Sequence, residues 1–176
     1  MHIMQKTTKR ALFIAVPVAC LVLGAAVLYY LKRSGPYYLP DITLETLDGH
    51  PVALNSFRGK PTLVIFWAST CSTCLEELPS LINLYNTYSR QGLEILGIVI
   101  YYNDPLEAEQ MVKHRKIPYR ILLDQNKKAT YAFGNVHLTP TTFLISPQGK
   151  IVYRQTGKTD FKLIQKTIKS YLTKQE

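Results

Sequence analysis

The stretch FWASTCSTCLEELPSL, residues 66–81, decides how this sequence is interpreted. It places Cys71 and Cys74 three positions apart, directly after an apolar run (PTLVIFWA, residues 61–68) that is typical of a buried strand. The apolar residues that follow recur at helical spacing to about residue 90, with Pro79 expected to kink the helix. The two cysteines therefore lie at a junction between a strand and a helix.

This position favours redox chemistry. Cysteine reacts as its thiolate, and a helix N-terminus stabilises that anion through its unpaired N–H groups and its dipole. We therefore predict that Cys71, where the helix begins, is the nucleophile, because the helix lowers the pKa of its thiol. Cys74 lies one turn further along the same face, where it can close a disulfide and act as the more buried, resolving thiol. A C-x-x-C pair beside alternating strands and helices is typical of a thioredoxin-like redox motif.

Two other interpretations of the cysteine pair are weaker. Structural zinc needs four ligands, but the chain has a single C-x-x-C pair, and His50, His114 and His137 show no paired spacing. Two ordinary buried thiols would have no reason to share a strand–helix junction. We therefore expect no metal, and no cofactor other than a redox-active disulfide between Cys71 and Cys74.

The rest of the chain predicts an α/β domain that starts near Pro40. Alternating apolar runs on either side of Asp48-Gly49 predict a hairpin. Buried strands alternate with helices, so we expect a mainly parallel central sheet, closed by a hairpin that supplies antiparallel edge strands. Strands are expected at residues 61–68, 93–102, 119–124, 141–146 and 150–157, and helices at residues 71–90, 105–116, 127–133 and 161–174.

The N-terminal segment differs in composition. Residues 11–31 (ALFIAVPVACLVLGAAVLYYL) carry no charge and, as a helix, are long enough to span a hydrocarbon core of about 30 Å. Three basic residues precede this stretch and two follow it, which favours a cytoplasmic N-terminus. A cleaved signal peptide has a shorter apolar region. We therefore predict a cytoplasmic tail (residues 1–10), a transmembrane anchor (11–31), a linker (32–39) and a folded domain (40–176).

The net charge of +9 does not indicate a nucleic-acid partner. Five of the 21 basic residues flank the apolar stretch, and from residue 36 onward 16 Lys and Arg face 12 Asp and Glu. The lysines near the C-terminus recur at helical steps, as on the solvated face of a helix.

A second motif supports the redox interpretation. The stretch HLTPTTFLIS, residues 137–146, places Thr139-Pro140 immediately before a strand. Beside a C-x-x-C motif, this pattern predicts a cis peptide bond that lies across from the cysteines and leaves the Thr139 backbone free to pair with an extended substrate. An ordinary turn proline at the start of a strand is the alternative.

From about Leu39 onward, the chain resembles the TlpA/ResA/CcmG (DsbE) family of membrane-tethered disulfide reductases. The resemblance rests on LPDITLETLDGHPVALNSFRGKPTLVIFWASTCSTC (residues 39–74) and TPTTFLISPQGKIV (residues 139–152). It implies a thioredoxin fold with an extra N-terminal hairpin, anchored in the bacterial inner (cytoplasmic) membrane with the domain on the periplasmic or extracytoplasmic side. It also implies reduction of disulfides in exported proteins, often apocytochrome c, with electrons from a membrane donor of the DsbD or CcdA type.

The same resemblance assigns roles to individual residues. Cys71 is the nucleophile, Cys74 is the resolving thiol, and Thr139-Pro140 is the cis-proline pair. The residues expected to contact substrate are Trp67, which matches an aromatic residue four positions before the first cysteine, together with Ser72, Thr73, Thr139 and Pro140.

Glu77 matches an acidic residue that the family uses near its disulfide. A carboxylate one helical turn beyond Cys74 could raise thiol pKa values and accept protons during exchange. The alternative is an ordinary surface glutamate, as we expect for Glu76.

The sequence also departs from the family. Many relatives carry a proline before the second cysteine, whereas this chain has Ser72-Thr73 between the two. The hydroxyls of Ser72 and Thr73 could donate hydrogen bonds to a cysteine thiolate. Such bonds would stabilise the reduced form and make the Cys71–Cys74 disulfide more oxidising. An oxidase, an isomerase or a stress-related exchanger therefore remains an alternative to a reductase. The residue pattern of a peroxidase of the same superfamily is missing. A copper-delivery protein of this kind would space its cysteines one residue wider and add a histidine ligand, and His137 lies near the region expected for that ligand.

Overall fold

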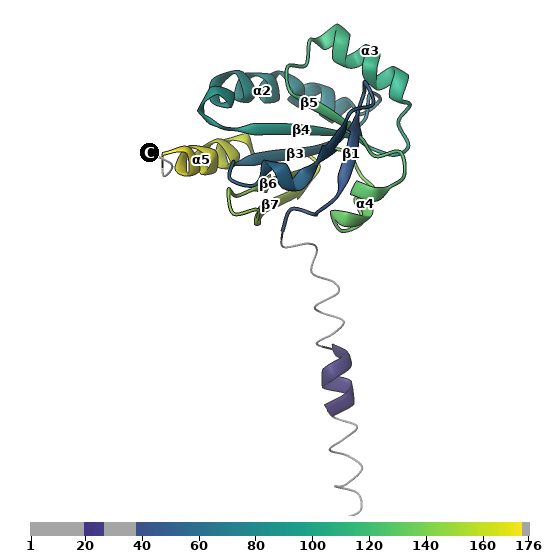
Figure 1. Cartoon of the computed structure of the whole chain (residues 1–176), viewed down its shortest axis with the longest axis vertical. Coiled ribbons are helices and arrows are strands. Elements are labelled where there is room, and N and C mark those ends of the chain that lie inside the picture. Colours follow the sequence, from purple (N-terminus) through teal and green to yellow (C-terminus); the bar gives the residue numbers. More distant parts are fainter. Residues whose placement is uncertain (1–19, 27–37, 174–176) are drawn as a thin grey trace, which may run out of the picture. The chain divides into compact units, whose positions relative to one another are not determined.

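The computed structural model describes residues 20–26 and 38–173. Residues 20–26 are helical, but the rest of the predicted anchor, the predicted tail and residues 32–37 of the linker lie outside the described residues. In the described part of the chain, no helix is both long and apolar enough to cross a membrane. The chain divides into two units, Met1–Gly35 and Pro36–Glu176, and the second contains the folded domain (Figure 1).

The order of elements in the domain follows the predicted one closely. The strands are β1 (Thr43–Thr46), β2 (Pro51–Ala53), β3 (Thr62–Trp67), β4 (Glu94–Val99), β5 (Arg120–Leu123), β6 (Thr141–Ile145) and β7 (Ile151–Thr156). The α-helices are α2 (Ser72–Tyr88), α3 (Pro105–Arg115), α4 (Lys128–Ala132) and α5 (Phe161–Leu172), and two 3-10 helices are η1 (Leu54–Phe57) and η2 (Ser89–Gln91).

The described strands form one mixed sheet in the order β2-β1-β5-β4-β3-β6-β7. β3, β4 and β5 are parallel, and the other neighbouring pairs are antiparallel. The predicted closing hairpin is present, but the prediction that both of its strands are edges is wrong. β6 pairs with β3 as well as with β7 and is therefore an internal strand. All five of its residues are buried, as expected for a strand that is covered on both faces.

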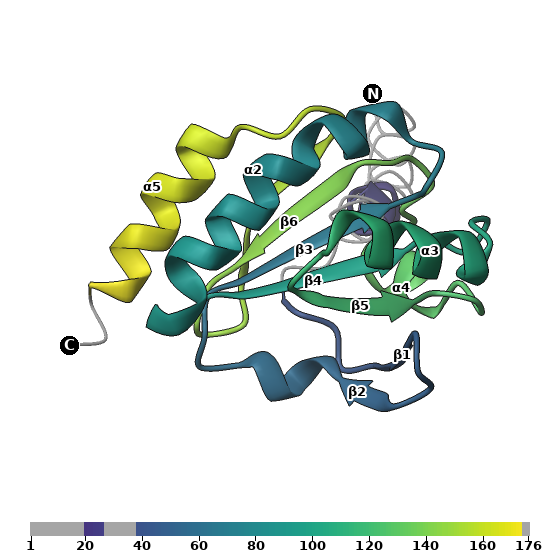
Figure 2. The same cartoon turned by 90° about the horizontal axis from the view of Figure 1, so that it is seen from above.

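Helices cover both faces of the sheet, and the β1–β2 hairpin extends the sheet beyond β5 (Figure 2). On one face, α2, α3 and α5 pack against Leu63 and Ile65 of β3. On the other face, α4 and the segment from Leu39 to Phe57 pack against Val64 and Phe66 of the same strand. Alternate side chains of β3 thus enter two different buried clusters, which explains its continuous apolar sequence. All of the described strands and both clusters lie in the second unit, which therefore has a core of its own.

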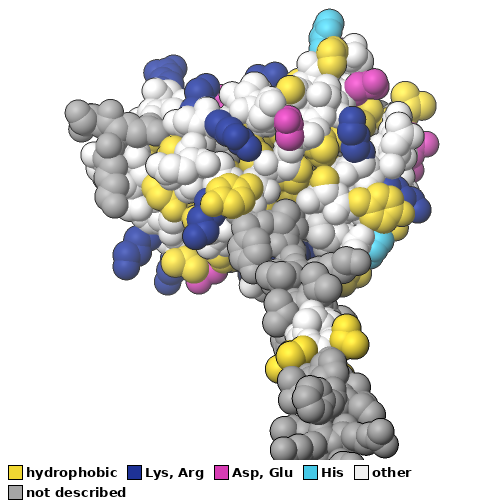
Figure 3. Space-filling model, turned by 60° about the horizontal axis from the view of Figure 1, so that its bottom comes forward, with side chains coloured by type: hydrophobic (Ala, Val, Ile, Leu, Met, Phe, Trp, Pro, Cys, Tyr) yellow, Lys and Arg dark blue, Asp and Glu magenta, His cyan; other side chains and the backbone are white. Residues whose placement is uncertain are grey.

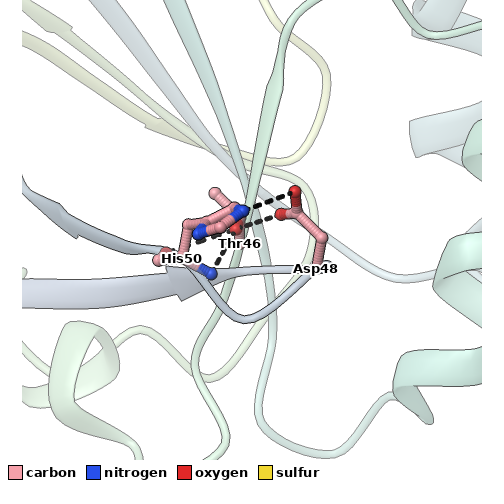
Figure 4. A network of polar contacts seen from close by, with 3 residues as sticks. All are labelled: Thr46, Asp48 and His50. Carbon is pink, nitrogen blue, oxygen red and sulfur yellow. Dashed lines mark hydrogen bonds and ion pairs between the residues drawn. The ribbon is translucent and has the colours of Figure 1, made fainter.

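A polar network fixes the turn of the predicted N-terminal hairpin (Figure 4). The hydroxyl of Thr46 donates to Asp48 Oδ1 and accepts from the backbone N–H of His50 at 2.9 Å. The hydrogen bond from Thr46, more than the nearby His50, lowers the pKa of the exposed Asp48 carboxyl. Gly49 has a φ of 82°, the left-handed conformation that favours glycine in a tight turn.

Several boundaries differ from the predicted ones. β4 ends at Val99 instead of residue 102, because Asn103 N–H bonds to the Ile100 carbonyl and turns the chain away from the sheet. α2 runs through Pro79 to Tyr88 as one helix. The folded unit also includes the end of the predicted linker. Leu39 is buried, and Tyr38 forms a bridge with Lys150. On the face shown in Figure 3, the Lys and Arg side chains are spread out instead of gathered in one patch.

Candidate active site

The two cysteines lie where the chain passes from β3 into α2. β3 ends at Trp67, and α2 begins at Ser72 with Cys71 as its N-cap. The Cys71 sulfur accepts a hydrogen bond from the backbone N–H of Cys74 at 3.2 Å. The N–H of Leu75 donates to the Cys71 carbonyl and so begins the helix. Cys71 is thus held at the end of α2 where unpaired N–H groups stabilise an anion.

Cys71 and Cys74 are joined by a disulfide with an S–S distance of 2.21 Å and a Cα–Cα distance of 5.3 Å. The two residues differ in access to solvent. Cys71 is half-buried at the surface, whereas Cys74 is only 7% exposed. The prediction that Cys74 is the more buried thiol is confirmed. An incoming sulfur can reach Cys71 more readily than Cys74.

The peptide bond between Thr139 and Pro140 is cis, as predicted. β6 begins at the next residue, Thr141, which pairs with Phe66 near the end of β3. Pro140 and Cys74 line the same pocket, so the cis-proline loop and the disulfide meet there. Among the described residues, no hydrogen bond engages the backbone N–H or carbonyl of Thr139. Both groups are therefore free to pair with an extended peptide.

Glu77 is buried. Its residue is 5% exposed, whereas the neighbouring Glu76 is exposed. The Oε1 atom of Glu77 accepts a hydrogen bond from the N–H of Thr159 at 2.5 Å, and Oε2 accepts from the Thr159 hydroxyl at 2.9 Å. Thr159 precedes α5, and its hydroxyl also lies 3.0 Å from that of Thr142 in β6. Glu77 lines the same pocket as Cys74, which excludes the alternative of an ordinary surface glutamate.

Trp67 forms part of the wall of this pocket. It is 7% exposed, and within the described part of the chain its indole N–H has no hydrogen-bond partner. The neighbouring strand makes room for the ring at Gly97, where a Cβ would lie 3.1 Å from Trp67 Nε1 and 2.7 Å from Ile121 Cδ1. Tyr119 lines the same pocket, and burial raises the pKa of its hydroxyl.

Ser72 and Thr73 occupy the first turn of α2. Ser72 is exposed and Thr73 is half-buried. With the disulfide closed, neither hydroxyl donates to a sulfur among the described residues, and the hydrogen bond recorded at Cys71 comes from a backbone N–H. The effect of these hydroxyls on the reduced form stays a prediction.

A polar network that sequence reasoning missed holds the loop before Cys71. Asn103 Oδ1 accepts hydrogen bonds from the N–H and from the hydroxyl of Ser69, both at 2.7 Å. The same hydroxyl lies 3.0 Å from Glu107 Oε2, and Asn103 Nδ2 donates to the Asp104 carbonyl. In the sequence, the Asn-Asp-Pro run before α3 signals a helix start. No local pattern shows that Asn103 binds Ser69, which lies 34 positions earlier.

The described residues contain no group of three or more His, Cys, Asp or Glu side chains that could hold a metal ion. The groups at the site that can change oxidation state are the two sulfurs of Cys71 and Cys74. This arrangement can transfer two electrons between a dithiol and a disulfide.

Comparisons with known proteins agree with this chemistry. Residues 35–171 match the Redoxin family. The chain is 34% identical over 134 residues to the thiol-disulfide oxidoreductase ResA of Geobacillus thermodenitrificans, an alignment that covers 74% of this chain and 75% of the relative. The thioredoxin domain of a thiol-disulfide oxidoreductase from Bacteroides vulgatus superposes with a TM-score of 0.66 at 28% identity, covering 77% of this chain and 98% of that one. A thiol:disulfide interchange protein from Chlorobium tepidum, 24% identical, has the same fold, with a TM-score of 0.67 and coverage of 79% and 98%. The chain therefore belongs to the redoxin family, in its thioredoxin-fold branch of TlpA-, ResA- and CcmG-like thiol-disulfide oxidoreductases.

Proposed function

We propose that this protein is a membrane-anchored oxidoreductase that reduces disulfides of exported proteins on the extracytoplasmic side of the bacterial inner membrane. The observation that carries the exchange chemistry is the disulfide at the start of α2 between half-buried Cys71 and buried Cys74. Cys74 lines a pocket together with Pro140 of the cis Thr139-Pro140 peptide. The reducing direction is the one implied by the resemblance to the TlpA/ResA/CcmG family.

In this direction, the reaction begins with both cysteines reduced. The Cys71 thiolate attacks one sulfur of the substrate disulfide, which forms a mixed disulfide and releases the other substrate sulfur as a thiolate. Cys74 then loses its proton and attacks the Cys71 sulfur, which closes the Cys71–Cys74 disulfide and releases the second substrate thiolate. Two electrons pass from the protein to the substrate, and the two substrate thiolates take up protons.

Glu77 is placed to assist the second step. Cys74 is buried and must lose a proton before it can attack. Glu77 lines the same pocket and is held by Thr159, so its carboxylate can receive that proton and pass it to solvent or to the leaving thiolate. In the first step, the N-terminus of α2 stabilises the attacking Cys71 thiolate.

The substrate, the electron donor and the location are part of the proposal. The uncharged residues 11–31 support a single-pass anchor, and the basic residues before them support an extracytoplasmic domain. Disulfides in exported proteins, including apocytochrome c, are the substrates that this location and the family resemblance favour. A membrane protein of the DsbD or CcdA type would return the domain to its dithiol form.

The first test is the redox equilibrium of the domain, residues 36–176, against glutathione or thioredoxin. A potential near that of thioredoxin, roughly −270 mV, would support a dedicated reductase. A potential near roughly −120 mV would overturn the reducing direction and make the protein an oxidase or a general exchanger. The Ser72-Thr73 dipeptide would then be the first candidate for the cause of the high potential.

A trapping experiment tests the exchange itself. In a Cys74→Ser variant, the mixed disulfide between Cys71 and the substrate cannot be resolved, so substrate proteins should accumulate on the chain in cells. The Cys71→Ser, Cys74→Ser double variant is the matched control and should trap nothing. A Cys74→Ser chain that traps no more protein than the double variant would contradict the enzymatic proposal.

A further inference from the structure

Exposed apolar side chains lie on two segments near the loop that leads to the disulfide. Two segments flank the loop that leads to Cys71. One is the turn after β4, where Ile100 N–H bonds to the Trp67 carbonyl and Asn103 holds Ser69. The other is the stretch before β6 that ends in the cis peptide. The first carries Tyr102, which is 51% exposed, and the second carries Leu138, which is 65% exposed. Both side chains are therefore accessible to a partner molecule.

These two segments touch each other through an aromatic cluster. The rings of Tyr101 and Tyr102 meet edge-on with centroids 5.2 Å apart, and His137 lies 6.3 Å from Tyr101. The Lys127 ammonium lies 4.4 Å from the centroid of the Tyr101 ring. The Tyr102 hydroxyl lies 3.3 Å from the Thr139 hydroxyl. We use the term aromatic shelf for Tyr101, Tyr102, His137, Leu138 and Thr139.

The aromatic shelf is held in place before any partner arrives. Tyr101 is half-buried and packs against the same apolar cluster as Cys71, and Lys127 and His137 restrain its ring. Tyr102 rests on Tyr101 and reaches Thr139. A tyrosine fixed in this way offers a large contact area at a low cost in conformational entropy.

We propose that the aromatic shelf binds an aromatic or branched aliphatic side chain of the substrate polypeptide, close in sequence to the cysteine that reacts with Cys71. The proposal rests on the thiol-disulfide exchange proposed above and names a preference within its substrate class. Its occupant is an extended peptide segment, because the shelf is continuous with the free backbone groups of Thr139. In an extended peptide, alternate side chains lie on the same side, so a residue two positions from the substrate cysteine can point the same way as that cysteine.

The test compares two peptide disulfides, each a symmetric dimer of acetyl-Gly-Cys-Gly-X-Gly-amide with X as Phe or Ala. Their second-order rates of reduction by the reduced domain are measured, with 2-hydroxyethyl disulfide as a small third substrate. We expect the Phe peptide to react about three- to tenfold faster than the Ala peptide, in line with the strength of an aromatic contact. In Tyr102→Ala and in Leu138→Ser, this ratio should fall towards one.

Two further variants sharpen the result. Tyr102→Phe keeps the ring and should keep most of the ratio. Tyr38→Ala removes another exposed tyrosine, 58% exposed, beside Lys150 at the opposite end of β6, and should keep the full ratio. The ratio is taken within each variant, so a change in overall activity does not affect it.

The outcomes separate this inference from the proposed function. If the unmodified domain reduces both peptides at the same rate, the shelf has no role in substrate choice, and the exchange function stands. If it reduces none of the three disulfides, the proposed function fails as well. If sedimentation shows a dimer that Tyr102→Ala disrupts, the shelf is covered by a second copy of the chain, and the proposal is overturned.

Discussion

The carboxylate of Glu77 is the charged group among the described residues that line the pocket beside Cys74. In Glu77→Gln, the charge is lost, while one acceptor oxygen remains for Thr159. A nearby negative charge disfavours a thiolate, so we expect the pKa of the Cys74 thiol to be lower in the reduced variant than in the unmodified reduced domain. The ultraviolet absorbance of the thiolate, followed against pH, measures this change.

Glu76→Gln is the matched control, because it removes an exposed carboxylate from the adjacent position of the same helix. An equal change in thiol pKa in both variants would show a general charge effect and contradict a specific role for Glu77. Glu77→Ala should also cost about 1–3 kcal/mol in the free energy of unfolding, because it leaves the buried Thr159 N–H without its acceptor.

Tyr119 couples burial to stability at alkaline pH. Burial raises the pKa of its hydroxyl above the ordinary value of 10.0, so Tyr119 ionises in the unfolded chain at a pH where the folded protein keeps it neutral. Its contribution to stability is complete below about pH 10 and is lost as the pH rises towards the folded-state value. When the pH is raised from about 9 to about 11, the free energy of unfolding of the unmodified domain should decrease because Tyr119 ionises in the unfolded chain. The Tyr119→Phe variant has no such group, so we expect its decrease to be smaller by about 1.4 kcal/mol. Urea unfolding at the two pH values measures the difference, and equal losses would contradict it.

Between elements, Asn103 ties the loop after β3 to the turn after β4. In Asn103→Ala, the N–H and the hydroxyl of Ser69 lose their shared acceptor. We expect a loss of about 1–3 kcal/mol in the free energy of unfolding, measured by urea denaturation. Asn86→Ala, at an exposed position of α2, is the matched control and should change stability by less than about 0.5 kcal/mol. Similar losses in the two variants would show that the link to Ser69 adds no stability.

Local signals in the sequence were sufficient to predict most elements of the domain. The predicted helix starts at residues 105 and 161 are confirmed, and the side chains of Asp104 and Asp160 cap α3 and α5. The β-type run at residues 61–68 became β3 because its alternate residues fill two buried clusters. The end of β4 was not predictable, since Tyr101 and Tyr102 have high strand propensity. In the structure, the turn closed by the hydrogen bond from Asn103 N–H to the Ile100 carbonyl ends the strand despite that propensity.

The candidate site was predictable to the extent that its residues are close in sequence. Cys71 and Cys74 stand in one motif, and the cis Thr139-Pro140 peptide follows from a second. The partner of Glu77 was not predictable, because Thr159 lies 82 positions away and reaches it only when α5 packs beside α2. Contacts between distant segments leave no periodic pattern in the sequence.

For the whole molecule, the proposed function depends on where the domain is held. Residues 11–31 carry no charge, and we expect the full chain to remain with membranes after alkaline carbonate extraction. A chain that starts at Pro36 keeps each strand that the structure describes and both apolar clusters. It should therefore be released into the soluble fraction and still reduce 2-hydroxyethyl disulfide. A full chain that carbonate releases as readily as this fragment would contradict the anchor.

The proposed orientation of the anchor rests on a narrow margin of charge. Three basic residues, Lys6, Lys9 and Arg10, precede the apolar stretch, and Lys32 and Arg33 follow it. Because positive charge favours the cytoplasmic side, neutralising the first three should reverse the balance and place part of the domain population in the cytoplasm. Neutralising Lys32 and Arg33 widens the margin and should leave all of the domain outside. Protease added to spheroplasts would digest the outer population alone, so protection of the domain in the unmodified chain would overturn the extracytoplasmic assignment while leaving the exchange chemistry intact.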